Sequence, residues 1–89
     1  MTATFRPGDI VRITNRISCA VYLYDSADTN FRNRTCIAYR HHAPMVMEIM
    51  ADQLLLLHTH DDGGCCLSWS MSEWWDPIDL WDLTQAYRR

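Results

Sequence analysis

Short segments with the residue pattern of β-strands follow one another along most of the chain, and this limits the fold more than any other feature. In several of them apolar and polar residues alternate, as in a strand that buries one face. The segments are residues 5–14, 16–25, 35–40, 45–50, 54–59 and 65–70. Turn-forming residues separate them, most clearly at 60–64, where Asp62 and Gly63 suit the backbone of a hairpin. The pattern predicts a mainly β fold.

The end of the chain carries the pattern of a short helix. Asp76 can cap a helix start, Pro77 suits the first helical position, and Asp79 favours the positive end of the helix dipole. Apolar residues then recur at helical spacing, which predicts a helix over residues 77–87. We therefore expect one domain, residues 1–89, folded as a small antiparallel SH3-like barrel of about five to six strands with a short C-terminal helix.

Two parts of the chain carry motifs found in known small barrels. The motif residues are Phe5, Gly8, Asp9, Val11 and Ile13 at the start, Pro44 and Met45 in the middle, and Cys66, Trp69, Trp75 and Leu80 later. The opening resembles the first strand of SH3-like barrels, and the whole set loosely resembles short bacterial proteins of the DUF2158 (YodC-like) type. This resemblance implies a fold and no activity, and residues 15–43 would be an insertion. The compact, lysine-free chain is also similar in style to small phage or mobile-element accessory proteins, including anti-CRISPR-type inhibitors.

Charge is distributed unevenly along the chain. Residues 1–42 hold six arginines and three aspartates, residues 43–89 hold eight acids and two arginines, and the net charge is −3. This balance argues mildly against a general nucleic-acid binder. The opening residues lack an apolar signal region and no segment has the length of a membrane span, so we expect a cytoplasmic protein with reduced thiols. No catalytic motif or phosphate-binding glycine loop occurs, which favours a binding protein without a cofactor over an enzyme.

The acidic tryptophan segment, residues 72–83, is the leading candidate for a binding surface. Trp74 and Trp75 are adjacent, so on extended backbone they cannot both point inward. An exposed tryptophan among carboxylates can anchor a protein interface, and carboxylates can present negative charge as phosphates do. We expect protein–protein recognition, extending to phage-type inhibition of a nucleic-acid-handling complex, with a homodimer as the simpler use of the same surface. The residues of this surface are Glu73, Trp74, Trp75, Asp76, Asp79 and Asp82.

Two alternatives remain open. The first is nucleic-acid binding by the arginine-rich region 26–40, where aromatic and guanidinium groups could contact bases and phosphates. Its residues are Phe31, Arg32, Arg34 and Arg40. The second is a small zinc-binding protein, because His58 and His60 share a strand face and a turn could bring Cys65 or Cys66 beside them. The paired ligand spacing of common zinc motifs is absent, so the sequence does not settle whether these residues bind a metal.

Overall fold

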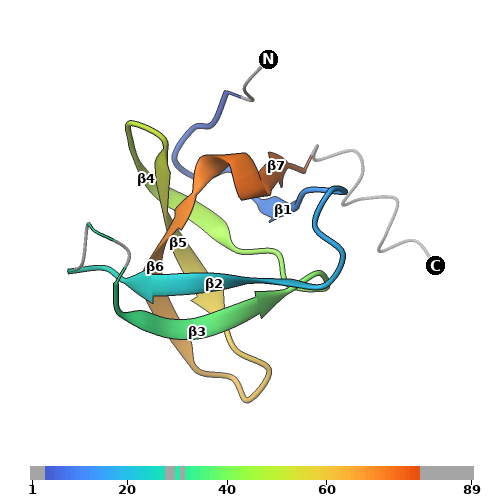
Figure 1. The fold of residues 1–89 in the computed structure, drawn as a ribbon, viewed down its shortest axis with the longest axis vertical. Helices are drawn as coiled ribbons and strands as arrows, with labels where there is room; N and C mark the ends of the chain where they lie inside the picture. Colours follow the sequence, from blue (N-terminus) through green and yellow to red (C-terminus); the bar gives the residue numbers. More distant parts are fainter. Residues whose placement is uncertain (1–3, 28–29, 31, 79–89) are drawn as a thin grey trace.

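The computed structural model describes residues 4–27, 30 and 32–78 and contains seven strands and one short 3-10 helix (Figure 1). The elements are β1 (Val11–Ile13), β2 (Ala20–Asp25), β3 (Arg34–Tyr39), β4 (Met45–Met50), β5 (Gln53–Thr59), β6 (Cys65–Met71), η1 (Ser72–Trp74) and β7 (Trp75–Pro77). The six strands expected from the sequence all form, and the hairpin expected at 60–64 joins β5 to β6. The mainly β, antiparallel prediction is confirmed.

The strands form a five-stranded sheet, in the order β3-β2-β6-β5-β4, and a two-stranded sheet of β1 and β7. Backbone hydrogen bonds join the two sheets where residues 8–11 run beside β4. There the Gly8 N–H donates to the Val46 carbonyl (2.6 Å) and the Val46 N–H donates to the Asp9 carbonyl (2.8 Å). Figure 1 shows β1 and β7 beside each other, with β2 and β3 running across β5 and β6. The larger sheet therefore curls, and its concave side faces inward.

Apolar side chains from both sheets fill the core. Alternation along β5 sends Leu54, Leu56 and His58 to the inside, where all three are at most 1% exposed. Trp75 from β7 is the largest fully buried side chain, and its indole N–H donates to the Ser70 hydroxyl (2.7 Å). A buried tryptophan with its N–H satisfied contributes a large apolar area at little polar cost. The core thus depends on Trp75.

Two finer predictions about the fold are not met. Within the described residues the strands form two sheets and no closed barrel. The expected start of the helix is wrong, because Pro77 ends β7 opposite Val11 and the Ile78 N–H donates to the Ile10 carbonyl (2.8 Å). Proline suits this place because a short edge strand tolerates a residue that cannot donate to the ladder. The rest of the expected helix, residues 79–87, lies outside the described part of the chain.

In the described part of the chain, no helix has the length and apolar character required to cross a membrane.

Candidate metal centre

Four metal-ligating side chains converge on the concave side of the five-stranded sheet. They are Cys36, His58, His60 and Cys66, and one ligand atom from each lies within 4.8 Å of those of the other three. We call this group the cysteine–histidine cluster. His58 is buried, whereas the other three side chains are half-buried, so an ion from solvent can reach the cluster.

The β5–β6 hairpin places three of the four ligands. His58 lies directly opposite Cys66 in the strand register, and His60 follows two residues after His58, on the same side of the chain. The hairpin that joins the strands is closed by the His60 N–H, which donates to the Gly64 carbonyl (2.6 Å). Gly63 has a φ of 93°, a left-handed conformation that favours glycine. Local turn chemistry therefore fixes most of the cluster.

Cys36 comes from β3, which is not a neighbour of β5 or β6. Strand β2 lies between them, but only Tyr24 and Asp25 of β2 pair with β6. The curl of the sheet brings the Cys36 Sγ to 3.7 Å from the Cys66 Sγ. The β2–β3 register skips Thr35, and the Thr35 hydroxyl lies 3.1 Å from the Ser68 hydroxyl of β6. This bulge and its polar contact hold β3 against the inner side of β6.

The distances within the cluster are close to the edges of a tetrahedral zinc site. Zinc bonds of about 2.3 Å to sulfur and about 2.0–2.1 Å to nitrogen give S–S and S–N edges of about 3.8 Å and about 3.6 Å. The Cys36 Sγ to Cys66 Sγ distance is 3.7 Å, and the Cys36 Sγ to His58 Nδ1 distance is 3.8 Å. Two sulfur and two imidazole ligands also match the chemistry that zinc prefers.

Burial keeps His58 in the neutral form that a metal requires. Desolvation, followed by the neighbouring His42 and His60, lowers the pKa of His58 to about 4, and Asp61 opposes this shift only weakly. Its Nε2 is buried and has no hydrogen-bond partner among the described residues, while its Nδ1 has only the distant thiol of Cys36. A bound ion at Nδ1, the nitrogen that faces Cys36, would replace this weak contact with a metal–nitrogen bond.

The Cys36 thiol is protonated in the metal-free chain. Burial, together with the neighbouring Cys66, raises the pKa of Cys36 to about 11. Two adjacent thiolates would repel each other, and a divalent cation between them removes that repulsion. Zinc binding therefore releases protons here, as it does at other cysteine sites.

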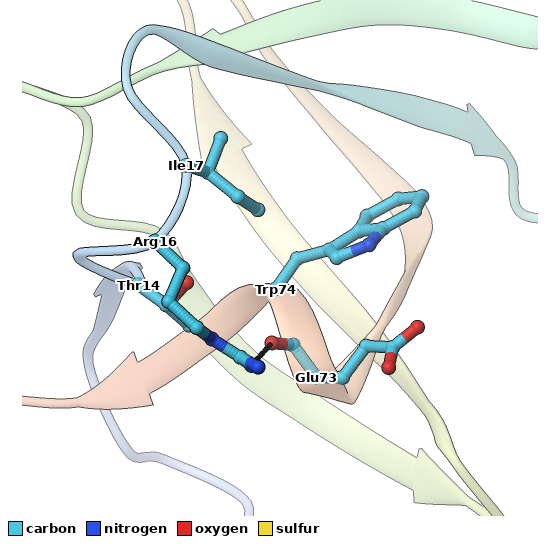
Figure 2. A pocket seen from close by; sticks show the side chains of 5 residues that line it. All are labelled: Thr14, Arg16, Ile17, Glu73 and Trp74. Carbon is cyan, nitrogen blue, oxygen red and sulfur yellow. Dashed lines mark hydrogen bonds between the residues drawn. The ribbon is translucent and has the colours of Figure 1, made fainter.

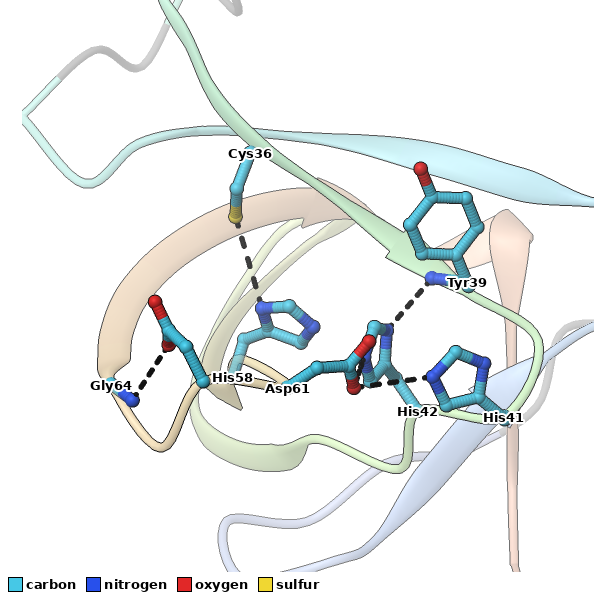
Figure 3. Close-up of polar contacts among 8 residues, drawn as sticks. Cys36, Tyr39, His41, His42, His58, Asp61 and Gly64 are labelled. Carbon is cyan, nitrogen blue, oxygen red and sulfur yellow. Dashed lines mark hydrogen bonds and ion pairs between the residues drawn. The ribbon is translucent and has the colours of Figure 1, made fainter.

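A second group, the histidine–aspartate cluster, lies beside the first and consists of His41, His42 and Asp61 (Figure 3). The Tyr39 N–H donates to His42 Nδ1 (2.9 Å), so the proton of a neutral His42 is on Nε2. That Nε2 lies 2.9 Å from Asp61 Oδ1 and donates to it, while His41 Nε2 lies 3.3 Å from the same oxygen. These hydrogen bonds lower the pKa of Asp61. His42 thus has no free lone pair to offer a metal.

The structure brings together His58, His60 and Cys66, three of the four residues considered for zinc from the sequence. Cys65 is exposed, because it precedes Cys66 on the strand and points the opposite way. The sequence analysis missed Cys36. Alternation in β3 indicates that Cys36 shares the inner face with Ala38, but no sequence signal shows which strand it faces.

The acidic tryptophan segment divides between core and surface. Trp75 is 1% exposed and holds the core, Trp74 is half-buried, Glu73 is exposed, and Asp76 lies half-buried in the middle of β7. Asp79 and Asp82 lie outside the described residues. Figure 2 shows the Trp74 ring and Ile17 on either side of a hollow of about 270 Å³, lined by Thr14, Arg16, Ile17, Glu73 and Trp74. The Arg16 guanidinium donates to the Glu73 carbonyl (3.3 Å) beside it.

The arginines proposed for nucleic-acid contact have different surroundings. The Arg40 guanidinium donates to the carbonyls of Thr14 (3.0 Å) and Ile17, so it braces the loop between β1 and β2. Arg34 is exposed, and its guanidinium lies over the ring of Tyr22. Arg32 is also exposed, and Phe31 lies outside the described residues. Arg40 therefore stabilises the fold through hydrogen bonds to the backbone, whereas Arg34 lies at the surface.

Comparisons with known proteins identify no family for this chain. No family model matches it, and neither the curated proteins nor the solved structures contain a match.

Proposed function

We propose that the protein is a small, non-enzymatic β module that binds one zinc-class divalent ion through Cys36, His58, His60 and Cys66. The observation that carries this proposal is the convergence of four ligand atoms within 4.8 Å, with Sγ–Sγ and Sγ–Nδ1 distances of 3.7 Å and 3.8 Å that are close to the edges of a tetrahedral site. The proposal replaces the expectation of a protein without a cofactor.

The ligand set favours a structural role for the ion. Structural zinc sites use four protein ligands, whereas catalytic sites keep one position open for water or substrate. Here two cysteines and two histidines would fill all four positions of a tetrahedral ion. A structural ion agrees with a binding module better than with an enzyme. A cytoplasmic location belongs to this proposal, because it keeps free thiols reduced and able to bind metal.

The ion would strengthen the weakest part of the large sheet. Strand β3 contacts the β5–β6 hairpin across the concave side, and the ladder between β2 and β6 is limited to Tyr24–Trp69 and Asp25–Ser68. Coordination by Cys36 from β3 together with His58 and Cys66 from β5 and β6 would join these strands directly. Metal binding would then contribute to folding stability, as it does in other small zinc domains.

Metal analysis of the purified protein tests the proposal. We expect one zinc per chain, and a tetrahedral, thiolate-coordinated spectrum when cobalt replaces zinc. Cys66→Ser should abolish both signals. Cys65→Ser is the matched control, because it removes the adjacent thiol that points away from the cluster. Substoichiometric metal in the wild type, or equal loss in the two variants, would contradict the site.

A second candidate function is protein recognition at the hollow beside Trp74. The half-buried indole, the exposed Glu73 and the cavity of about 270 Å³ support it, since interface anchors often combine an aromatic ring with a pocket. We propose a basic partner, and the acidic segment suits a phage-type inhibitor of a nucleic-acid-handling complex. Trp75 is not part of this surface, because its removal would destroy the core.

Affinity capture from the native host tests this second candidate. Wild type should retain a specific protein that Trp74→Ala and Glu73→Arg lose, with each variant first shown to keep its zinc and its circular dichroism spectrum. Retention by all three proteins would place the interface elsewhere. Retention of nothing except the protein itself would indicate a homodimer.

A further inference from the structure

The outer face of β2 and β3 carries an exposed aromatic surface on the side of the sheet opposite the cysteine–histidine cluster. Tyr22 is 46% exposed, Ile37 38% and Tyr39 47%. Their neighbours along the strands, Val21, Leu23 and Ala38, are buried. We call Tyr22, Arg34, Ile37 and Tyr39 the β2–β3 platform. Neighbouring exposed aromatic and apolar side chains can mark a binding surface.

Strand register makes these side chains neighbours. Tyr22 lies directly opposite Ile37, and Tyr39 lies opposite Ala20, two residues along each strand. Because residues two apart point to the same side, the two tyrosines occupy diagonal positions, for which a separation of about 7–8 Å is typical. Ile37 fills the space beside Tyr22. The rings therefore form one continuous surface.

An arginine and a histidine lie against this surface. The Arg34 guanidinium carbon is 4.4 Å from the centroid of the Tyr22 ring, a cation–π contact that places the charge over one face of the ring. The His41 ring is nearly parallel to the Tyr39 ring, at 7° and 6.0 Å between centroids. No acidic residue occurs between positions 10 and 24 or between positions 29 and 47. Asp25 lies at the end of β2, and Asp61 Oδ1 lies 3.3 Å from His41 Nε2.

We propose that the β2–β3 platform binds single-stranded nucleic acid, with bases stacked on Tyr22 and Tyr39 and a phosphate beside Arg34. Stacking on aromatic rings and ion pairing with arginine are the two contacts that sequence-tolerant single-strand binding uses. Charge complementarity favours this ligand over a second copy of the chain, because a two-fold face-to-face dimer would bring the two Arg34 side chains together. The proposal goes beyond metal binding and does not depend on it.

Fluorescence anisotropy with labelled oligo(U) and oligo(dT) tests this proposal. We expect Tyr22→Ala and Tyr39→Ala each to weaken binding about 10-fold, because a stacked base contributes about 1–3 kcal/mol. Tyr22→Phe and Tyr39→Phe should bind like wild type, because the ring face remains. Arg34→Ala should lower the salt slope by about 0.7, the value for one phosphate contact on a single strand.

The matched control is Arg12→Ala, which removes an equally charged, exposed residue from β1 in the other sheet. It should leave affinity unchanged. Absence of binding at about 50 mM salt, where phosphate contacts are strong, would overturn the proposal. So would equal losses in Arg12→Ala and Arg34→Ala. Sedimentation of each protein checks for self-association, and a wild-type dimer that Tyr22→Ala dissociates would assign the face to a second copy instead. The circular dichroism spectrum, measured for every variant, separates loss of the platform from loss of the fold.

Discussion

Two groups of side chains of metal-ligating types lie in contact, and only one of them has the arrangement expected of a metal site. The rings of His42 and His58 meet edge to face, 4.6 Å apart, yet they belong to different clusters. His58 is buried and has almost no hydrogen bonds, whereas His42 receives one hydrogen bond and donates another. Proximity of metal-ligating residue types is therefore not enough by itself to identify a metal site. The position of the proton on each ring decides what the ring can do.

Burial explains much of this difference. In the cysteine–histidine cluster, desolvation opposes charge on His58 and on Cys36, so the metal-free groups are neutral and poorly satisfied. In the histidine–aspartate cluster, the Asp61 side chain is 73% exposed and accepts hydrogen bonds from two histidines. On our proposal, the first cluster would gain stability from an added cation. The second already has its partners and gains little.

Removing the metal should have the largest effect on stability. If it has no effect, the contrast between the two clusters is wrong. We expect a chelator, or His58→Ala, to lower the free energy of unfolding by roughly 3 kcal/mol or more, because structural zinc contributes directly to folding. Thermal denaturation followed by circular dichroism, with and without chelator, measures this. His41→Ala should keep the full chelator-sensitive shift. A wild-type melting temperature that does not change when chelator is added would count against a structural ion.

Oxidation of the metal-free protein should have the next largest effect. Cys36 and Cys66 lie 3.7 Å apart at their sulfurs, whereas Cys19 and Cys65 are exposed on other parts of the surface. After zinc removal, the thiol oxidant diamide should therefore join Cys36 to Cys66. Bound zinc should prevent this reaction, because coordinated thiolates are shielded. Peptide mapping by mass spectrometry identifies the pair, and preferential linkage through Cys65 would show that the cluster geometry is wrong.

Disrupting the histidine–aspartate cluster should have the smallest effect. His42→Ala removes the acceptor of the Tyr39 N–H and the donor to Asp61, and should cost about 1 kcal/mol of stability. His41→Ala, at an exposed side chain, should change stability by about 0.5 kcal/mol or less. Both variants should retain one zinc per chain. Loss of zinc from His42→Ala would mean that the two clusters form a single site.

The sequence predicted features that depend on neighbouring residues, and it did not predict features that depend on contacts between distant strands. Alternation and turn residues located β1 to β6, and His58, His60 and Cys66 came from one hairpin whose turn was recognisable. Cys36 could not be assigned in this way, because it reaches Cys66 across the curl of the sheet, past β2. Trp75 shows a similar limit, since its burial depends on β7 pairing with β1 at the other end of the chain.

By itself, the sequence determined the elements that form through neighbouring residues. These are the alternating strands and the 60–64 hairpin, whose Gly63 provides the left-handed backbone. Tertiary structure alone decided that Pro77 ends a strand rather than opening a helix, that Trp75 is core, and that Cys36 completes a four-ligand cluster. The physical reason is that backbone pattern and turn chemistry act over a few residues. Burial and coordination depend on which distant strands the folded chain brings together.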